Sequence, residues 1–197
     1  DMGLGKTVQV LGYLERLRGD KSSARVLLVV PASLLSNWTR EAARFAPKLE
    51  PLILHGRSSA ALEELLEKHP AFLTVTTYGM AARIKGLQDI FWECVILDEA
   101  QAIKNPLTKQ TQALKQLSAH MRVAMTGTPV ENDLTNLWSL FDFLNKGLLG
   151  SSQAFKTFCK GLDERPEGYA RLRAMVAPFL LRRLKTDKRI IADLPEK

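Results

Sequence analysis

The sequence has no apolar run near the ~20 residues that a membrane-spanning helix needs, so we expect neither a membrane span nor a membrane partner. Cysteine is scarce: only Cys94 and Cys159 occur, far apart and outside any metal-ligand spacing. Cys94 lies in an apolar run, which predicts a buried, reduced thiol. Internal repeats and low-complexity segments are also lacking. These absences exclude a disulfide-stabilised miniprotein and a repeat array, and they favour an ordinary globular domain in a reducing compartment.

Acidic residues are fewer than basic ones. The 197 residues hold 21 Asp and Glu against 28 Lys and Arg, a formal net charge of +7. Such a surplus suits a polyanionic partner such as nucleic acid, but many basic proteins bind nothing acidic. The charge by itself therefore leaves a nucleic-acid partner open.

Short apolar runs rich in β-branched residues predict five buried strands. They are Val26–Val30, Pro51–Leu54, Phe72–Thr76, Cys94–Leu97 and Arg122–Met125. Helical stripes fall between most of them, such as Val10, Leu14 and Leu17, and then Leu34, Trp38, Ala42 and Phe45. Strands that alternate with helices predict an α/β fold with a parallel sheet covered on both faces.

The pattern changes after about Asn132, where helical periodicity replaces the strands. An amphipathic helix is marked by Leu134, Leu137, Trp138, Phe141 and Leu144, with Asn132 or Asp133 as its cap. After a Gly/Ser-rich break at residues 145–153, a second apolar face contains Leu172, Met175, Val176 and Phe179. Only residues 189–192 suggest another strand. We therefore expect a helical appendage on an α/β core.

The first seven residues, Asp-Met-Gly-Leu-Gly-Lys-Thr, form a candidate phosphate-binding loop. Glycines let backbone N–H groups curl around phosphates, and the N-terminus of the following helix adds positive potential. In such a loop the lysine reaches the β- and γ-phosphates and the threonine hydroxyl ligates Mg²⁺. We assign ATP binding to Gly3, Leu4, Gly5, Lys6 and Thr7. The strand that should feed this loop would lie before Asp1, so we expect a chain truncated at its start.

Two acids, Asp98 and Glu99, follow the apolar run Cys94–Leu97. An apolar strand that ends in two acids is the second half of a nucleotide hydrolase. Asp98 is expected to hold Mg²⁺ through water, and Glu99 to orient and deprotonate the attacking water. An exposed acidic turn is the alternative, but the loop and the acids occur in the order that a nucleotide site requires.

Thr126, Gly127 and Thr128 follow the last predicted strand of the core. Hydroxyls at the carboxyl end of a strand point into the crevice where α/β sheets bind ligands. We expect these residues to couple the state of the γ-phosphate to the rest of the protein. A simple turn remains the alternative.

Together these stretches resemble motifs I, II and III of helicase superfamily two, and more narrowly those of the Swi/Snf family of DNA translocases. The matching segments are residues 1–7, 97–105 and 126–132. Residues 29–38 and 76–78 are similar to the family's motifs Ia and Ib, and residues 178–185 and 193–197 to its signature before the second lobe. The resemblance covers almost the whole chain and implies a RecA-like lobe that uses ATP and Mg²⁺.

The chain departs from the family pattern at two points. Gln101 stands where the family more often has histidine. Glutamine can still hydrogen-bond near the γ-phosphate, so Gln101 joins Glu99 as a catalytic candidate, and its frequency in bacterial relatives favours a bacterial protein. Motifs IV to VI, which form the second RecA-like lobe with its arginine fingers, are absent. We therefore expect truncation at the end as well, and no ATP hydrolysis by residues 1–197 alone.

The resemblance also places motif Ia, motif Ib and the segment after motif II against one strand of duplex DNA. The expected phosphate contacts are Ser33, Asn37, Thr76, Thr77, Lys104 and Asn105. Phosphate contacts position a protein without reading sequence. The basic residues between 171 and 189 form either a second DNA-facing surface or a solvated face with a role between lobes. Trp38 and Trp138 lie on apolar stripes, which indicates packing rather than base stacking.

The sequence thus predicts a RecA-like lobe 1 at residues 1–133, a helical protrusion inserted after motif III at residues 134–186, and the start of a connection at residues 187–197. The expected function is the ATP-binding half of a double-stranded DNA translocase that remodels or displaces DNA-bound proteins, such as RNA polymerase or a repair complex. Alternatives are a related helicase acting on RNA or single strands, and a non-hydrolysing DNA-binding scaffold. The expected location is the bacterial nucleoid in the cytoplasm, or the nucleus of a eukaryote.

Overall fold

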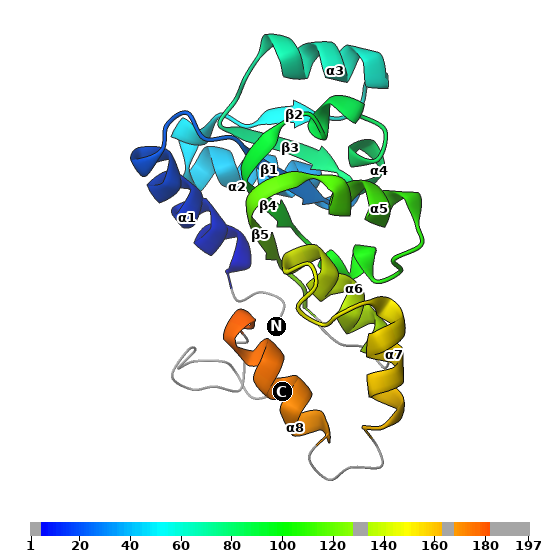
Figure 1. Cartoon of the computed structure of the whole chain (residues 1–197). Coiled ribbons are helices and arrows are strands. Elements are labelled where there is room, and N and C mark those ends of the chain that lie inside the picture. Colours follow the sequence, from blue (N-terminus) through cyan, green and yellow to red (C-terminus); the bar gives the residue numbers. More distant parts are fainter. Residues whose placement is uncertain (1–4, 128–133, 163–167, 182–197) are drawn as a thin grey trace, which may run out of the picture.

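The computed structural model describes residues 5–127, 134–162 and 168–181. A five-stranded sheet in the order β2-β3-β1-β4-β5, with every pair parallel, forms the centre of the upper lobe in Figure 1. The strands are β1 (Val26–Val30), β2 (Leu52–Leu54), β3 (Leu73–Thr77), β4 (Phe91–Leu97) and β5 (Ser118–Ala124). This confirms the predicted α/β fold with a parallel sheet.

Helices connect the strands and continue beyond them. They are α1 (Lys6–Asp20), α2 (Leu35–Phe45), α3 (Ser59–Lys68), α4 (Tyr78–Ala81), α5 (Lys109–Gln116), α6 (Leu134–Leu144), α7 (Ser152–Lys160) and α8 (Gly168–Val176). Short 3₁₀ turns are η1 (Ala32–Leu34), η2 (Pro47–Leu49), η3 (Lys85–Leu87), η4 (Ala100–Ile103) and η5 (Ala177–Phe179). In the described part, no helix has both the length and the apolar character needed to cross a membrane.

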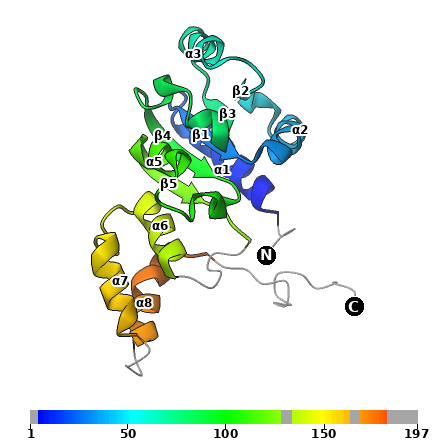
Figure 2. The same cartoon turned by 90° about the vertical axis from the view of Figure 1, so that its right-hand side faces the viewer.

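Alternate residues of each strand pack on opposite faces of the sheet, as the pleat requires. Leu28 and Val30 of β1 join a core with α1 and α2, whereas Leu27 and Val29 join a core with α3, α4, α5 and α6. Figure 2 shows these two helical layers on either side of the strands. Because both faces are covered, a continuous apolar run such as β1 is stable only in the middle of the sheet.

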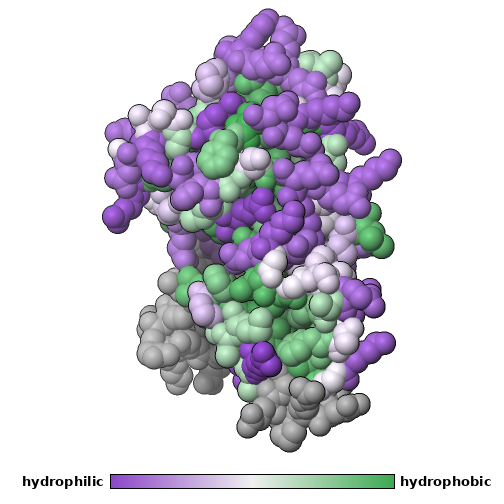
Figure 3. Space-filling model, viewed as in Figure 1, coloured by the Kyte–Doolittle hydropathy of each residue, from purple (hydrophilic) through white to green (hydrophobic). Residues whose placement is uncertain are grey.

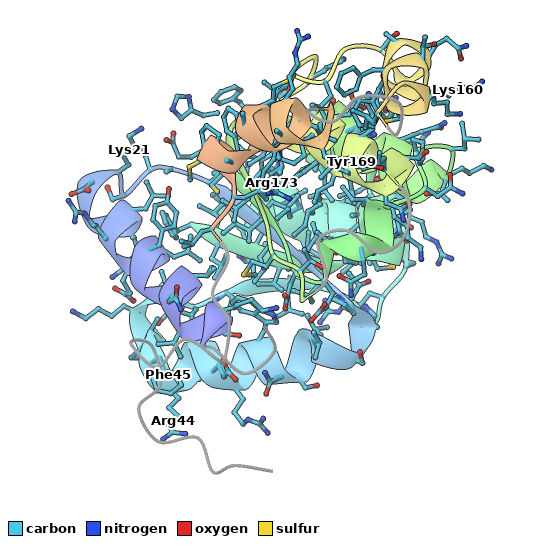
Figure 4. All side chains as sticks on the ribbon, turned by 90° about the horizontal axis from the view of Figure 1, so that it is seen from below. Lys21, Arg44, Phe45, Lys160, Tyr169 and Arg173 are labelled. Atoms are coloured by element: carbon cyan, nitrogen blue, oxygen red, sulfur yellow. The ribbon has the colours of Figure 1, made fainter. Side chains whose placement is uncertain are left out.

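The predicted stripe on α2 needs a correction at its end. Phe45 is 47% exposed, and the guanidinium of Arg44 lies 4.9 Å from the centre of its ring. Figure 4 shows the two residues together at the end of this helix. Trp38, Ala42 and Ala46 are buried instead. The buried face therefore follows an i, i+4, i+8 spacing, which leaves Phe45 on its rim.

The helices after the sheet form a third core of their own. Leu137 and Phe141 of α6 pack there with Phe155 of α7, and with Leu172 and Val176 of α8. The predicted helical appendage is therefore present in the structure. Its proposed caps at residues 132 and 133 and the suggested strand at residues 189–192 lie outside the described residues.

Two apolar residues predicted for the α8 face are more exposed than expected. Met175 is 37% exposed, and Phe179 in η5 is 49% exposed, with its ring edge against Phe141 at 6.4 Å between centres. Cys94 in β4 is fully buried, as predicted. Burial raises the pKa of its thiol to about 12, which keeps this thiol protonated.

Candidate active site

The carboxyl ends of four strands line up along one edge of the sheet. Val30 of β1 pairs with Thr77 of β3, and Leu97 of β4 pairs with both Val29 of β1 and Ala124 of β5. The residues that follow these strands therefore meet in one row, at the edge where parallel α/β sheets bind ligands. Motifs Ib, II and III, which are far apart in the sequence, come together at this edge.

Lys6 is the first residue of α1, and Gly5 before it adopts a left-handed conformation with φ 71°. That backbone favours glycine. The Nζ of Lys6 is buried, and no atom of the described residues hydrogen-bonds to it. A buried ammonium without a partner is costly, and a bound phosphate at this helix N-terminus would supply one. Gly5, Lys6 and Thr7 thus fit a nucleotide, whereas Gly3 and Leu4 lie outside the described residues.

Asp98 lies directly after β4 and is 5% exposed. Burial raises the pKa of this carboxyl, while two hydrogen bonds and the positive charge of Lys6 act in the opposite direction. The Oδ2 atom accepts a hydrogen bond from Nε1 of Trp38 at 2.7 Å, and Oδ1 accepts one from the amide of Glu99 at 3.0 Å. A carboxylate has about four lone-pair sites, so both oxygens can still accept from Mg²⁺-bound water. Asp98, with Thr7, therefore suits a Mg²⁺ ion that keeps most of its own waters.

Glu99 adopts a left-handed backbone, with φ 50° and ψ 54°, and its side chain is half-buried. Its Oε2 accepts a hydrogen bond from Nε2 of Gln101 at 2.7 Å. The Oε1 of Gln101 accepts in turn from the hydroxyl of Thr126 at 2.9 Å. Two catalytic candidates and one coupling candidate therefore form a single hydrogen-bonded chain between motifs II and III. Gly127 follows this chain and is half-buried, and Thr128 lies outside the described residues.

The described lobe thus contains an unpaired lysine ammonium, a buried carboxylate and a second carboxylate on one sheet edge. Residues 1–197 also match the family model of the SNF2-related domain along their whole length. The chain belongs to the SNF2-related family. This confirms the family resemblance that the motifs indicated.

Three relatives show how this SNF2-related chain compares with known proteins. YwqA of Bacillus subtilis, named for a proposed ATP-dependent helicase or translocase activity, is 40% identical over 205 residues, which are 100% of this chain and 22% of YwqA. The DNA excision repair protein ERCC-6-like of Danio rerio is 36% identical over 95% of this chain and 14% of its own length. The Sulfolobus solfataricus SWI2/SNF2 ATPase core, solved in complex with double-stranded DNA, is 40% identical with a TM-score of 0.88.

The Sulfolobus match covers 99% of this chain and 41% of that one, and it confirms the RecA-like lobe. YwqA is a bacterial protein, which agrees with the bacterial resemblance expected from Gln101. This chain spans about a fifth of YwqA and less than half of the Sulfolobus core.

Trp38 and Tyr78 of the SNF2-related lobe were missed as site residues by sequence reasoning. Trp38 is 3% exposed, so the prediction that it packs in the core is confirmed, but its indole N–H reaches Asp98. The hydroxyl of Tyr78 donates to the backbone oxygen of Asp98 at 2.7 Å. The rule that a buried Trp or Tyr needs a hydrogen-bond partner is the signal that predicts such contacts.

The motif Ia and Ib residues proposed for DNA are placed differently from one another. Ser33 is exposed in η1, and half-buried Asn37 hydrogen-bonds to Arg40 and Glu41 on the same helix. Thr76 is fully buried, and its hydroxyl donates to the oxygen of Leu54 at 2.9 Å. The structure therefore does not support the expected contact of Thr76 with a DNA phosphate, because the side chain is buried and its hydroxyl already has a partner.

Thr77 is 5% exposed at the end of β3, with its hydroxyl 3.4 Å from Nδ1 of His55. Lys104 and Asn105 are exposed after η4, on the segment that follows the acidic motif. The Oδ1 of Asn105 accepts from the amide of Leu107 at 2.9 Å, which shapes this loop. Lys104 thus combines exposure and positive charge, the two properties that a phosphate contact needs.

Proposed function

We propose that the chain is the first RecA-like lobe of an ATP-dependent translocase that moves along double-stranded DNA and displaces or remodels DNA-bound proteins. The observation that carries this proposal is the row of groups at one sheet edge. The Lys6 ammonium, which has no hydrogen-bond partner among the described residues, acts through its charge on the pKa of Asp98, and Glu99 follows directly. This arrangement is typical of a nucleotide hydrolase, and membership of the SNF2-related family supports DNA as the polymer along which it moves.

Within the proposed site, Gly3 to Thr7 bind the phosphates of ATP, and Thr7 and Asp98 hold Mg²⁺. The bound nucleotide supplies a phosphoanhydride bond with high group-transfer potential. Glu99 orients the attacking water and accepts its proton. Gln101 keeps the Glu99 carboxylate in one orientation through its 2.7 Å hydrogen bond and connects it to Thr126. The state of the γ-phosphate would pass to Thr126, Gly127 and Thr128 by this route.

The proposed DNA surface is the same carboxyl edge, extended over η1, the start of α2 and the loop after η4. Ser33, Asn37, Thr77, Lys104 and Asn105 remain its candidates, with Lys104 the strongest because it is exposed and cationic. A relative of known structure forms a complex with double-stranded DNA. Another relative is named as a DNA excision repair protein, in line with a repair complex as cargo. RNA polymerase is the second proposed cargo, and the bacterial nucleoid the proposed location.

The test is phosphate release by the two-lobed protein that carries this chain, with duplex DNA, single-stranded DNA, RNA or no nucleic acid. Duplex DNA is expected to stimulate hydrolysis most, and Lys6→Ala to abolish it because the phosphates lose their fixed positive charge. Displacement of the third strand of a DNA triplex, without separation of the duplex, would report movement. Best stimulation by RNA or single strands would indicate another helicase type. DNA binding without any hydrolysis would indicate a scaffold.

Residues 1–197 alone are proposed to lack DNA-stimulated hydrolysis. The family supplies transition-state arginines from its second lobe, and such an arginine contributes about 10³–10⁵ in rate. The same phosphate-release assay on residues 1–197, with and without duplex DNA, measures this. Robust stimulated release that Lys6→Ala abolishes would show that one lobe suffices, which would contradict the two-lobe mechanism.

A further inference from the structure

The Asp98 carboxylate is held from the layer of α1 and α2. Trp38 of α2 donates from its indole Nε1 to Oδ2 at 2.7 Å, and both side chains are buried. The amide of Glu99 donates to the other oxygen, Oδ1, at 3.0 Å. Because each oxygen has its own donor, the carboxylate plane is fixed before any ion binds.

The backbone of Asp98 is held from the opposite layer. Tyr78 of α4 packs in the core with α3 and α5, and its hydroxyl donates to the backbone oxygen of Asp98 at 2.7 Å. Tyr78 is 6% exposed, so this hydrogen bond is shielded from water. Two aromatic residues that lie on opposite faces of the sheet therefore hydrogen-bond to the same aspartate.

Each of these aromatic residues stands next to a proposed DNA contact. Trp38 follows Asn37 on α2, and Tyr78 follows Thr77 at the end of β3. The side chain of Asn37 hydrogen-bonds to Arg40 and Glu41 on the same helix. A movement of either segment by as little as a few tenths of an ångström would change a hydrogen bond to Asp98, since such bonds have a narrow distance range.

We propose that Trp38 and Tyr78 are positioning residues that couple DNA binding at motifs Ia and Ib to the Mg²⁺-holding carboxylate of Asp98. This inference rests on the proposed function, because it assumes DNA at one end of the link and the nucleotide's Mg²⁺ at the other. In this arrangement, DNA accelerates hydrolysis by restricting α2 and α4, and thereby the orientation of Asp98. If Trp38 and Tyr78 only packed in the core, they would not couple the binding of DNA to the binding of Mg²⁺.

The test uses Trp38→Phe and Tyr78→Phe in the two-lobed protein. Tyr78→Phe removes one donor and keeps the ring, whereas Trp38→Phe removes one donor and replaces the indole with a smaller aromatic ring. Trp92→Phe is the matched control for the first: Trp92 is also fully buried, and its indole donates to the oxygen of Leu87 at 2.9 Å, away from Asp98. Tyr13→Phe is the control for the second, because the Tyr13 hydroxyl donates to Sδ of Met121 at 3.8 Å, away from Asp98. Thermal unfolding of all four variants identifies any that fail to fold.

Two quantities are measured. The first is the binding of a fluorescent ATP analogue as Mg²⁺ is titrated, and the second is the ratio of ATPase rates with and without duplex DNA. Loss of a group that orients a metal ligand typically weakens metal affinity 10–100-fold. Trp38→Phe is expected to raise the Mg²⁺ concentration needed for half-maximal binding about tenfold. Both test variants should reduce stimulation by DNA, and both controls should leave the two quantities unchanged.

The outcomes separate the two proposals. A wild-type protein without DNA-stimulated hydrolysis would refute the proposed function and, with it, the coupling. A stimulated wild type whose Trp38→Phe and Tyr78→Phe variants keep the same Mg²⁺ dependence and stimulation would refute the coupling alone. A shift in Mg²⁺ dependence with unchanged DNA stimulation would also refute it, because the aromatic pair would then hold the ion without sensing DNA. If Trp38→Phe does not fold, Tyr78→Phe decides.

Discussion

The sheet lobe and the helical unit of α6, α7 and α8 are built in different ways. In the lobe, two apolar cores enclose the strands, and polar groups gather at the carboxyl edge, where they hydrogen-bond to one another. The helical unit has a single core of its own. Figure 3 shows apolar side chains gathered over this lower part of the molecule, below a mostly hydrophilic layer. The comparison teaches that the polar groups of the site are held within the lobe, while the helical unit adds a second core.

Helix α6 is the part that both regions share. Leu140 and Phe143 pack into the lobe core, while Leu137 and Phe141 pack into the helical core. The hydroxyl of Ser139 between them donates to the oxygen of Ile103 at 2.7 Å. One helix therefore carries the helical unit and touches the turn that follows the acidic motif.

Polar contacts fix α6 further along its length. Lys115 of α5 forms a 2.8 Å ion pair with Asp142, and both side chains are largely buried. Arg122 of β5 donates to the oxygen of Phe143 at 2.8 Å and also to the oxygen of Leu117. Burial lowers the pKa of Arg122, although a guanidinium remains charged under ordinary conditions. These contacts join α6 to α5 and β5 of the lobe.

The largest contrast is expected in catalysis. Glu99→Gln should retain ATP binding and lose about 10²–10⁴ of the hydrolysis rate, because a carboxamide cannot accept the proton of water. The matched control is Glu67→Gln, an exposed glutamate of α3 away from the carboxyl edge. Single-turnover phosphate release in the two-lobed protein measures both variants. Normal turnover by Glu99→Gln would show that another residue is the base.

The next contrast concerns stability. Phe143→Ala and Phe155→Ala each remove a buried ring, and each is expected to cost about 3–5 kcal/mol. Phe143 belongs to the lobe core, whereas Phe155 belongs to the helical core. Amide hydrogen exchange should therefore show faster exchange in β4, β5 and α5 for Phe143→Ala, and in α7 and α8 for Phe155→Ala. Identical exchange maps would mean that the two regions unfold as one unit.

A smaller effect is expected at the junction itself. Ser139→Ala leaves the oxygen of Ile103 without its buried donor, which should cost about 1–3 kcal/mol in the free energy of unfolding. Ser118→Ala, at an exposed position of β5, should cost less than about 0.5 kcal/mol. Urea unfolding of the two variants provides the comparison. Equal stabilities would mean that Ser139 does not help to fix α6 to η4.

The smallest effect is expected in DNA binding. Lys104→Ala should make the slope of log affinity against log salt shallower by about one unit on duplex DNA, without a change in sequence preference. Lys160→Ala, at an exposed position of α7 (Figure 4), should leave the slope unchanged. Fluorescence anisotropy at several salt concentrations measures both slopes. An unchanged slope for Lys104→Ala would remove Lys104 from the DNA surface, and a changed slope for Lys160→Ala would extend that surface to the helical unit.

Strand β1 could be predicted to the residue from the sequence, whereas β4 and β5 begin earlier than predicted, at Phe91 and Ser118. The run Val26–Val30 coincides with β1 because every residue in it is buried and apolar. β5 begins at Ser118 rather than Arg122, since its first four residues alternate polar with apolar and are exposed or only partly buried, so they form no continuous apolar run. The pairing of β5 with β4, which extends to Ser118, defines the strand there. Hydrogen bonds to a neighbouring strand are not visible in a hydropathy pattern.

The site residues also differ in how well they could be predicted from the sequence. Lys6, Asp98 and Glu99 were predicted because motif spacing reflects the chemistry of phosphate and Mg²⁺. The hydrogen bonds from Trp38 and Tyr78 to Asp98 were not predicted, because they depend on which core each aromatic residue enters. Thr76 illustrates the converse: its residue type suits a phosphate contact, but its position in β3 turns it toward Leu54. The predicted domain boundary near residue 133 stays a prediction, since residues 128–133 lie outside the described part.

The left-handed backbone at Glu99 has a consequence for how this lobe can be improved or evolve. A non-glycine residue in this conformation costs about 1–2 kcal/mol, and glycine would relieve that cost. Selection for heat resistance alone would therefore favour glycine in place of Glu99, and the more stable descendant would lack the proposed catalytic base. A library screened only for survival at high temperature would gradually lose the carboxylate proposed as the catalytic base. At this one residue, the stability of the fold and the proposed hydrolysis of ATP therefore favour different side chains.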